Sequence, residues 1–272
     1  MYQTVSQRSL GFREAVRWDM PREDLPMNVV ERIVRADPWR RTRLHDMRGN
    51  LIGLESVTDV PSIALQCVLR EAFGRRPIMP WIPGPAIRRL DSLLNRESRV
   101  LEFGSGMSTL WFALHCGFVH SVEQDVEWHA RVTSELRARN LTNVRLDLRL
   151  SEAEYGFAGD YLIGSFDLVV VDGAFRPTTA LTALHALKAG GAVYMDNTDF
   201  GAQWHYYADA EKILLEAAVR DGALFTYYSG FPPATLTANQ GLLVEWPPAV
   251  SPSCKAPLAD VVLQEGVNSE LA

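Results

Sequence analysis

The sequence predicts an α/β fold in which a doubly wound, mostly parallel sheet is covered by helices on both faces. Short β-branched stretches alternate with helical stretches from Arg99 onward, a glycine-rich turn follows the first of them, and a loop alone joins the last two. With 272 residues, 47% of them hydrophobic, the chain is long enough for one large domain with an appendage.

Five βα repeats are expected between Arg99 and Asp196, and strands joined by helices run parallel. The expected strands are residues 99–103, 119–122, 144–148, 167–172 and 192–196. The expected helices between them are residues 108–116, 126–139 and 178–188. A helix at residues 206–221 then precedes strands at residues 224–228 and 242–246, which should pair antiparallel because only a loop separates them.

The chain divides into three predicted regions. Residues 1–80 lack βα alternation and are expected to form a helical appendage or lid, with amphipathic stretches at residues 28–34 and 62–73. Its arginines, among them Arg40, Arg41 and Arg43, are interpreted as a solvated helix face. Residues 81–248 should form the sheet domain, and residues 249–272, rich in proline and small polar residues, a C-terminal tail.

Composition and charge exclude several classes of protein. Lys and Arg number 27 and Asp and Glu 33, so the net charge of −6 provides no general attraction for nucleic acid, which is not expected as a partner. The three cysteines, Cys67, Cys116 and Cys254, form no disulfide or zinc pattern, which favours a cytoplasmic localisation. Because no run of about 18 apolar residues occurs, no membrane association is expected.

The turn at residues 102–109, which reads EFGSGMST, follows the first predicted strand and opens a helix. Gly104 and Gly106 allow the backbone to approach a ligand closely, and Ser108 or Thr109 can cap the helix. Glu123 ends the second predicted strand, close to the spacing of about 20 residues at which a carboxylate meets a ribose in nucleotide sites. Asp125 is the alternative, and Glu123 is preferred because it continues directly from the apolar stretch. These positions predict a cofactor site.

The residue before the glycines indicates the charge of the ligand. Glu102 would repel a pyrophosphate, whereas it suits an ammonium or sulfonium group. Thr109 also replaces the third glycine of the dinucleotide-binding pattern. A dehydrogenase is therefore disfavoured, and a cationic ligand is expected.

Residues 102–109 resemble motif I of the class I S-adenosylmethionine-dependent methyltransferases, in the form of a bacterial branch with a GSGxST turn. The similarity spans roughly residues 80–246, through SVE at 121–123, FDLVVVDG at 166–173 and LKAGGAVYMDN at 187–197. The resemblance implies a Rossmann-like, seven-stranded sheet with a reversed final strand and S-adenosyl-L-methionine as cofactor. The cofactor-binding residues that it implies are Glu102 near the ammonium, Gly104, Ser105, Gly106 and Ser108 at the turn, Glu123 at the ribose, Ser151 and Glu152 near the adenine, and Asp172.

The expected catalytic residues are Asp172 and Asp196, which end the fourth and fifth predicted strands, and His205, which lies in the segment after the fifth. Asp172, Asp196 and Asn197 resemble the oxygen set of catechol-type O-methyltransferases, so Mg²⁺ is considered. The same residues form ordinary turn dipeptides, and the metal-free interpretation is favoured. For His205 a structural role is the alternative. Trp81 is interpreted either as a lid over the cofactor or as packing.

The function predicted from these observations is methyl transfer from S-adenosyl-L-methionine to an oxygen or nitrogen atom of a small molecule. An aminopropyltransferase-like enzyme and a non-catalytic, cofactor-binding scaffold protein are the alternatives. Gly104→Val is expected to abolish cofactor binding while the fold survives. The identity of the acceptor is left open, as is the oligomeric state, including a homo-oligomer.

Overall fold

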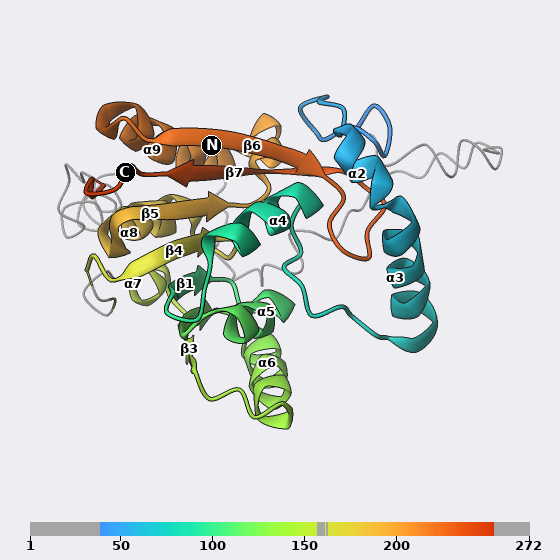
Figure 1. Cartoon of the computed structure of the whole chain (residues 1–272), viewed down its shortest axis with the longest axis horizontal. Helices are drawn as coiled ribbons and strands as arrows, with labels where there is room; N and C mark the ends of the chain where they lie inside the picture. The colour runs from blue at the N-terminus through green and yellow to red at the C-terminus, as the bar shows by residue number, and fades with distance from the viewer. Residues whose placement is uncertain (1–38, 157–160, 162, 253–272) are drawn as a thin grey trace, which may run out of the picture. The chain divides into compact units, whose positions relative to one another are not determined.

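The computed structural model describes residues 39–156, 161 and 163–252 of the chain. Residues 1–38 of the predicted appendage, which include residues 28–34, and most of the predicted tail lie outside the described residues. The described strands form one seven-stranded sheet in the order β3-β2-β1-β4-β5-β7-β6 (Figure 1). The strands are β1 (Arg99–Phe103), β2 (Phe118–Glu123), β3 (Val144–Leu148), β4 (Phe166–Val171), β5 (Leu187–Met195), β6 (Leu224–Gly230) and β7 (Asn239–Glu245).

Strand direction confirms the predicted α/β fold with a reversed final strand. The first five strands pair in parallel, and β7 pairs antiparallel with both β5 and β6. Since β6 is antiparallel to β7, it runs in the same direction as β5. The ends of β1 to β6 and the start of β7 therefore lie at one edge of the sheet, which we call the carboxyl edge. Ligands of open α/β sheets bind at this edge.

Helices cover both faces because side chains alternate along each strand. Leu101 and Phe103 of β1 pack in a cluster with α8 and α9, whereas Val100 packs in a second cluster with α4 and α5. The helices are α2 (Leu54–Thr58), α3 (Val60–Phe73), α4 (Gly84–Leu93), α5 (Met107–His115), α6 (Val126–Ala138), α7 (Glu152–Tyr155), α8 (Arg176–Ala186), the 3₁₀ helix η2 (Thr198–Ala202) and α9 (His205–Asp221). Among the described residues, no helix has the length and apolar character that a membrane-spanning segment needs.

Two strands begin earlier than the sequence predicted. β5 starts at Leu187, which pairs with Phe166, and the register shifts before Leu168, so residues predicted as helix and turn belong to an irregular strand. β7 starts at Asn239 because it pairs with Gly230 of β6. The predicted start of β5 is wrong by five residues and that of β7 by three, and the predicted end of helix α8, residue 188, lies two residues too late.

Residues 40–52, which we call the strap, cross the carboxyl edge beside β6 and β7. Arg40 Nε donates to Ala238 O over 3.0 Å, and Met47 N donates to the Asp199 carboxylate over 3.1 Å. The arginines of this region were predicted to form a solvated helix face, and that prediction is wrong for Arg40. Its side chain is 7% exposed, lies 3.6 Å from Asp199, and belongs to a segment of turns and bends.

Candidate cofactor site

The glycine turn, residues 104–106, leaves β1 at the carboxyl edge and leads into α5. Gly104 has φ of +100°, and a Cβ atom there would lie 2.8 Å from the backbone of Gly173, which follows β4. A residue with a side chain is therefore excluded at position 104, because the backbone at the end of β1 is in contact with the backbone at the end of β4. Gly106 differs, since a Cβ atom there would meet nothing closer than the Ser108 hydroxyl at 3.6 Å.

Internal acceptors satisfy the three backbone N–H groups of the glycine turn. Gly104 N donates to Val122 O over 2.9 Å, and Ser105 N donates to the Glu123 carboxylate over 3.1 Å. Gly106 N donates to Thr109 Oγ1 over 2.9 Å, so Thr109, one of the two capping candidates, caps the start of α5. None of these three donors is left for an external pyrophosphate.

Glu102 lies beneath the glycine turn and is fully buried. Its Oε2 atom accepts hydrogen bonds from Thr109 Oγ1 (2.5 Å) and Ser121 Oγ (2.6 Å), whereas its Oε1 atom is buried with no hydrogen-bond partner. Burial raises the pKa of Glu102 to about 7, although the surrounding hydroxyl groups lower it. An unsatisfied carboxylate oxygen is costly in the interior, so this atom is suited to an additional N–H donor.

Glu123 ends β2 and connects that strand to the glycine turn. Its Oε2 atom accepts from both the backbone N and the hydroxyl of Ser105, at 3.1 and 2.8 Å. Its Oε1 atom accepts from the backbone N atoms of Gln124 and Asp125. The structure therefore brings Glu102, Ser105 and Glu123 together around the turn.

The end of β3 lies next to this group, because Arg149 N donates to Glu123 O over 2.8 Å. Ser151 and Glu152, predicted near an adenine, follow as exposed residues at the start of α7. Ser151 Oγ caps this helix, and Glu152 accepts from the Thr178 hydroxyl. Their role toward a cofactor stays a prediction.

Arg176, which the sequence analysis did not select, links the ends of β4 and β5. Its guanidinium is buried and donates to the side chains of Asp172 (3.1 Å) and Asn197 (3.2 Å). It also donates to the backbone carbonyl groups of Val171, Asp172 and Asp196. The available sequence signal was an arginine four residues after a strand-end aspartate, on the first turn of a helix.

The two strand-end aspartates differ in accessibility. The Asp172 side chain is 30% exposed, whereas Asp196 is buried and accepts from the Tyr194 hydroxyl over 3.0 Å. Burial raises the pKa of both carboxyls; Arg176 lowers that of Asp172, and the nearby Asp172 raises that of Asp196 further. Of the two carboxylates, that of Asp172 is the one that pairs with the Arg176 guanidinium in the described part of the chain.

The guanidinium of Arg176 also bears on metal binding. It contacts the side-chain oxygens of Asp172 and Asn197 and the backbone carbonyl of Asp196, the three residues considered for Mg²⁺. A buried cation on these oxygens opposes a second cation in the same place. In the part of the chain that the structure describes, no three His, Cys, Asp or Glu side chains form a cluster suited to a metal ion.

His205, predicted as a general base, begins α9 and is exposed. It follows η2, whose Phe200 ring packs against those of Trp204 and Tyr207. Tyr207 in turn lies under the Arg176 guanidinium, 4.6 Å from ring centre to Cζ. Among the described residues, no hydrogen bond or ion pair joins His205 to Asp172, so its catalytic role stays a prediction.

Alternating arginine and tryptophan side chains lie beside the glycine turn; we call Arg70, Trp81, Arg76, Trp128 and Arg131 the Arg–Trp ladder. Each neighbouring pair is separated by 5.2 to 5.7 Å from guanidinium carbon to ring centre, within cation–π range. Trp128 Nε1 donates to Ser105 O over 2.6 Å. The ladder therefore joins the segment before α4 to the glycine turn, and Trp81 packs between arginines; its role as a lid stays a prediction.

Comparison with known proteins identifies the fold. No protein-family model matches the sequence, and no curated protein matches it significantly. The structure resembles the O-methyltransferase TomG from Streptomyces achromogenes, involved in tomaymycin synthesis and solved in complex with SAM, with a TM-score of 0.50 and 18% identity over 68% of this chain and 90% of that one. It also resembles a Klebsiella pneumoniae protein named as a candidate O-methyltransferase, with a TM-score of 0.51 and 16% identity over 71% of this chain and 100% of that one.

A third similar structure is that of cofactor-bound Rv0187 from MTB, with a TM-score of 0.50 and 18% identity over 71% of this chain and 95% of that one. At these identities the likeness concerns the fold. The chain has the fold of the class I S-adenosylmethionine-dependent methyltransferases, as the resemblance of its motif I implied.

Proposed function

We propose that the protein is an S-adenosylmethionine-dependent methyltransferase that acts on an oxygen or nitrogen atom of a small molecule. The observation that carries the proposal is the glycine turn between β1 and α5, with the buried Glu102 below it and the Glu123 carboxylate bound to Ser105. The fold supports it, since TomG shares this fold and was solved with SAM.

The residues around the turn fit this cofactor. The unpartnered Oε1 of Glu102 is suited to the ammonium group. The backbone at Gly106 is suited to the methionine portion, since a Cβ atom there would meet only Ser108 Oγ at 3.6 Å and Trp128 Nε1 at 4.0 Å. Glu123 would accept from the ribose, in place of the Ser105 hydroxyl that it binds in this structure. When bound, S-adenosylmethionine supplies a methyl group on a positively charged sulfur.

At the end of β4, the chain would align the methyl acceptor with the cofactor and accept a proton from the acceptor. Positioning of reactants is worth up to about 7 to 11 kcal/mol of a barrier. Asp172 is partly exposed and has a raised pKa, so it is our candidate for accepting a proton from the acceptor. Asp196 is too buried for this and would position Arg176 and the end of β5, without a metal ion.

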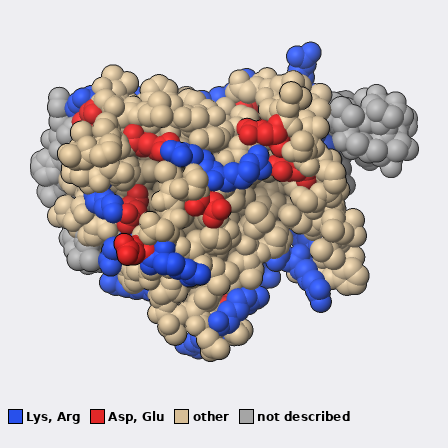
Figure 2. All heavy atoms as spheres, viewed as in Figure 1, with Lys and Arg blue, Asp and Glu red and all other residues tan. Residues whose placement is uncertain are grey.

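A small molecule is proposed as acceptor in preference to nucleic acid. On the face shown in Figure 2, acidic and basic side chains are interspersed over the upper part, where β4 to β6 lie in the same view. Mixed charge of this kind gives little sequence-independent affinity for a phosphate backbone.

Calorimetric titration with S-adenosylmethionine, decarboxylated S-adenosylmethionine and NAD tests the proposal. Saturable binding of the first ligand, together with methyl transfer in an acceptor panel, is the expected result. Preference for the decarboxylated form would instead identify an aminopropyltransferase, and binding without turnover would identify a scaffold protein. Absence of binding to S-adenosylmethionine would remove the proposal.

A further inference from the structure

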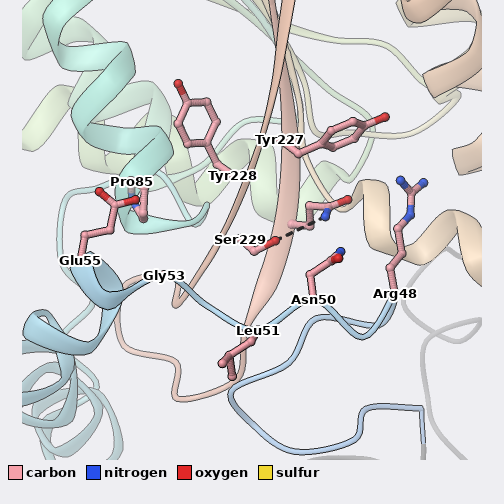
Figure 3. A pocket seen from close by; sticks show the side chains of 10 residues that line it. Arg48, Asn50, Leu51, Gly53, Glu55, Pro85, Tyr227, Tyr228 and Ser229 are labelled. Carbon is pink, nitrogen blue, oxygen red and sulfur yellow. Dashed lines mark hydrogen bonds between the residues drawn. The ribbon is translucent and has the colours of Figure 1, made fainter.

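A cavity opens on the carboxyl edge, away from the glycine turn. It has a volume of about 580 Å³, within the range of about 300 to 1,000 Å³ found for ligand pockets. The strap, the starts of α2 and α4, the end of β6 and the start of β7 line it. In Figure 3, Asn50 and Ser229 lie near its centre, with Tyr227, Arg48 and Leu51 around them.

The polar groups of this cavity are held in place from below. Asp46, fully buried, accepts from the amide of Asn50 (3.0 Å), the hydroxyl of Ser229 (2.8 Å) and the amide of Gln240 (3.0 Å). It also accepts from two backbone N–H groups of the strap. Side chains fixed in this way are preorganised for recognition, which lowers the entropic cost of binding a ligand.

The charged residues that line the cavity already have partners. Arg48 forms a two-pronged ion pair with Glu211, and Glu55 lies 3.8 Å from Arg88. The other lining groups are amides, hydroxyls, two tyrosine rings and short apolar side chains. Such a lining favours an uncharged ring compound that carries hydroxyl groups, because rings stack on tyrosine and hydroxyls bond to amides.

A buried hydrogen bond links the lining of the cavity to the segment that follows β5, near the proposed methyl-transfer region. Gln240 Oε1 accepts from the Thr198 hydroxyl over 3.1 Å, and Thr198 directly follows Asn197, the partner of Arg176. In the sheet order, β7 is two strands away from β4, and β6 is three strands away from it. At about 4.8 Å per strand, the cavity lies about 10 to 14 Å along the edge from Asp172.

We propose that this cavity binds the distal part of the methyl acceptor, and that the acceptor is an elongated, uncharged compound with at least one hydroxylated ring. The inference rests on the proposed methyltransferase function. It defines the acceptor further: a molecule of one small ring would be too short to reach both the cavity and Asp172.

Leu51 offers a direct test, because its side chain lines the cavity and is 62% exposed. Leu51→Trp fills the space with bulk and Leu51→Glu adds charge, and an exposed position tolerates both. Leu54→Trp is the matched control, since Leu54 is 87% exposed and is not among the lining residues. Thermal melting of all variants confirms folding.

Saturation-transfer NMR is measured with two neutral two-ring probes, 4,4′-dihydroxybiphenyl and methyl β-cellobioside, and with the anion biphenyl-4-carboxylate. We expect at least one neutral probe to bind the unmodified protein. The affinity of this probe should be at least tenfold lower for both Leu51 variants and unchanged for Leu54→Trp. The probe that binds distinguishes a phenolic ring from a sugar ring. No binding by either neutral probe, equal binding to the Leu51 variants, or stronger binding of the anion would overturn the inference.

Calorimetry with S-adenosylmethionine on the same proteins keeps the two proposals apart. Equal cofactor affinity in all variants, with loss of probe binding, supports the cavity as an acceptor site. Loss of cofactor binding in the Leu51 variants alone would show that this cavity belongs to the cofactor and would overturn the assignment. Failure of the unmodified protein to bind the cofactor defeats the proposed function while the probe result still decides whether the cavity binds a neutral ring compound.

Discussion

Glu102 is a residue whose burial predicts a pH dependence of ligand binding. Its pKa of about 7 means that the carboxylate form increases as the pH rises from 6 to 8. An ammonium group binds the charged form, so affinity for S-adenosylmethionine should rise by up to about tenfold over this interval. Calorimetry across the pH range measures the effect, and Glu102→Gln should remove it. A flat profile in the unmodified protein would contradict this role.

The raised pKa of Glu102 should make the stability of the ligand-free protein fall as the pH rises, whereas ligand affinity rises. Because the folded pKa of Glu102 lies above its ordinary value of 4.5, the folded chain without ligand favours the neutral carboxyl. The contribution of Glu102 to the free energy of unfolding is therefore largest at low pH, and it is lost as the pH rises from about 4.5 to about 7. The cofactor would offset part of that loss by pairing with the charged form.

The two glycines of the turn should respond differently to alanine. Gly104→Ala places a Cβ atom against Gly173 at a φ of +100°, which should cost about 1 to 3 kcal/mol of stability. This replaces the expectation that the larger Gly104→Val would spare the fold. Gly106→Ala should melt normally and weaken S-adenosylmethionine binding roughly tenfold, because its Cβ enters the proposed ligand space. Equal affinity in Gly106→Ala and the unmodified protein would place the ligand elsewhere.

At the scale of elements, the Arg–Trp ladder joins the segment before α4 to α6 and the glycine turn. Trp128→Phe removes the hydrogen bond to Ser105 O, worth about 0.5 to 1.5 kcal/mol, and should weaken S-adenosylmethionine binding about twofold to tenfold. Trp246→Phe is the control, since its indole N–H binds Asp221 and is remote in the sheet order from β1. Comparable cofactor affinity in the two variants would show that the ladder is only structural.

Arg176 anchors α8 to the ends of β4 and β5 and should make the site independent of metal. Titration with MgCl₂ should give no saturable heat, and methyl transfer should be unchanged by EDTA. Arg176→Gln leaves Asp172 and the carbonyl groups of the strand ends without their cation, a loss of about 3 to 5 kcal/mol. Denaturant unfolding measures that loss. Inhibition by EDTA, restored by Mg²⁺, would contradict the assignment.

Elements with strong local signals were predictable from the sequence, and elements defined by distant pairing were not. β1 and the glycine turn have the predicted positions because a short apolar stretch, glycines and a capping threonine lie next to one another. The early start of β5 depends on pairing with β4, and that of β7 on pairing with β6. Gly241 illustrates the difference: it looks like a loop residue, but a Cβ there would collide with the Tyr194 hydroxyl on β5.

At the scale of the whole described molecule, the carboxyl edge has two regions. The first, around β1, β2 and β4, holds the candidate cofactor residues, and motif spacing predicted it. The second, around β6 and β7, is formed with the strap, whose Arg40 contacts Ala238 almost the length of the described chain away. Residues so distant leave no periodicity or spacing to recognise, which is why Asp46 and the cavity could not be predicted.

The strap should stabilise the second region without affecting the first, and Asp46→Asn tests this separation. An amide at this buried position turns one acceptor oxygen into a donor that faces the N–H and O–H groups of Asn50, Ser229 and Gln240. Leaving a buried donor unsatisfied costs about 1 to 3 kcal/mol, and a domain of this size loses roughly 2 to 4 °C of melting temperature per kcal/mol. The variant should therefore melt roughly 2 to 12 °C lower. Its affinity for S-adenosylmethionine should stay within about twofold, since no Asp46 contact reaches the glycine turn. A large loss of cofactor affinity at temperatures where the variant is folded would mean that the two regions are coupled through β5 and its following loop.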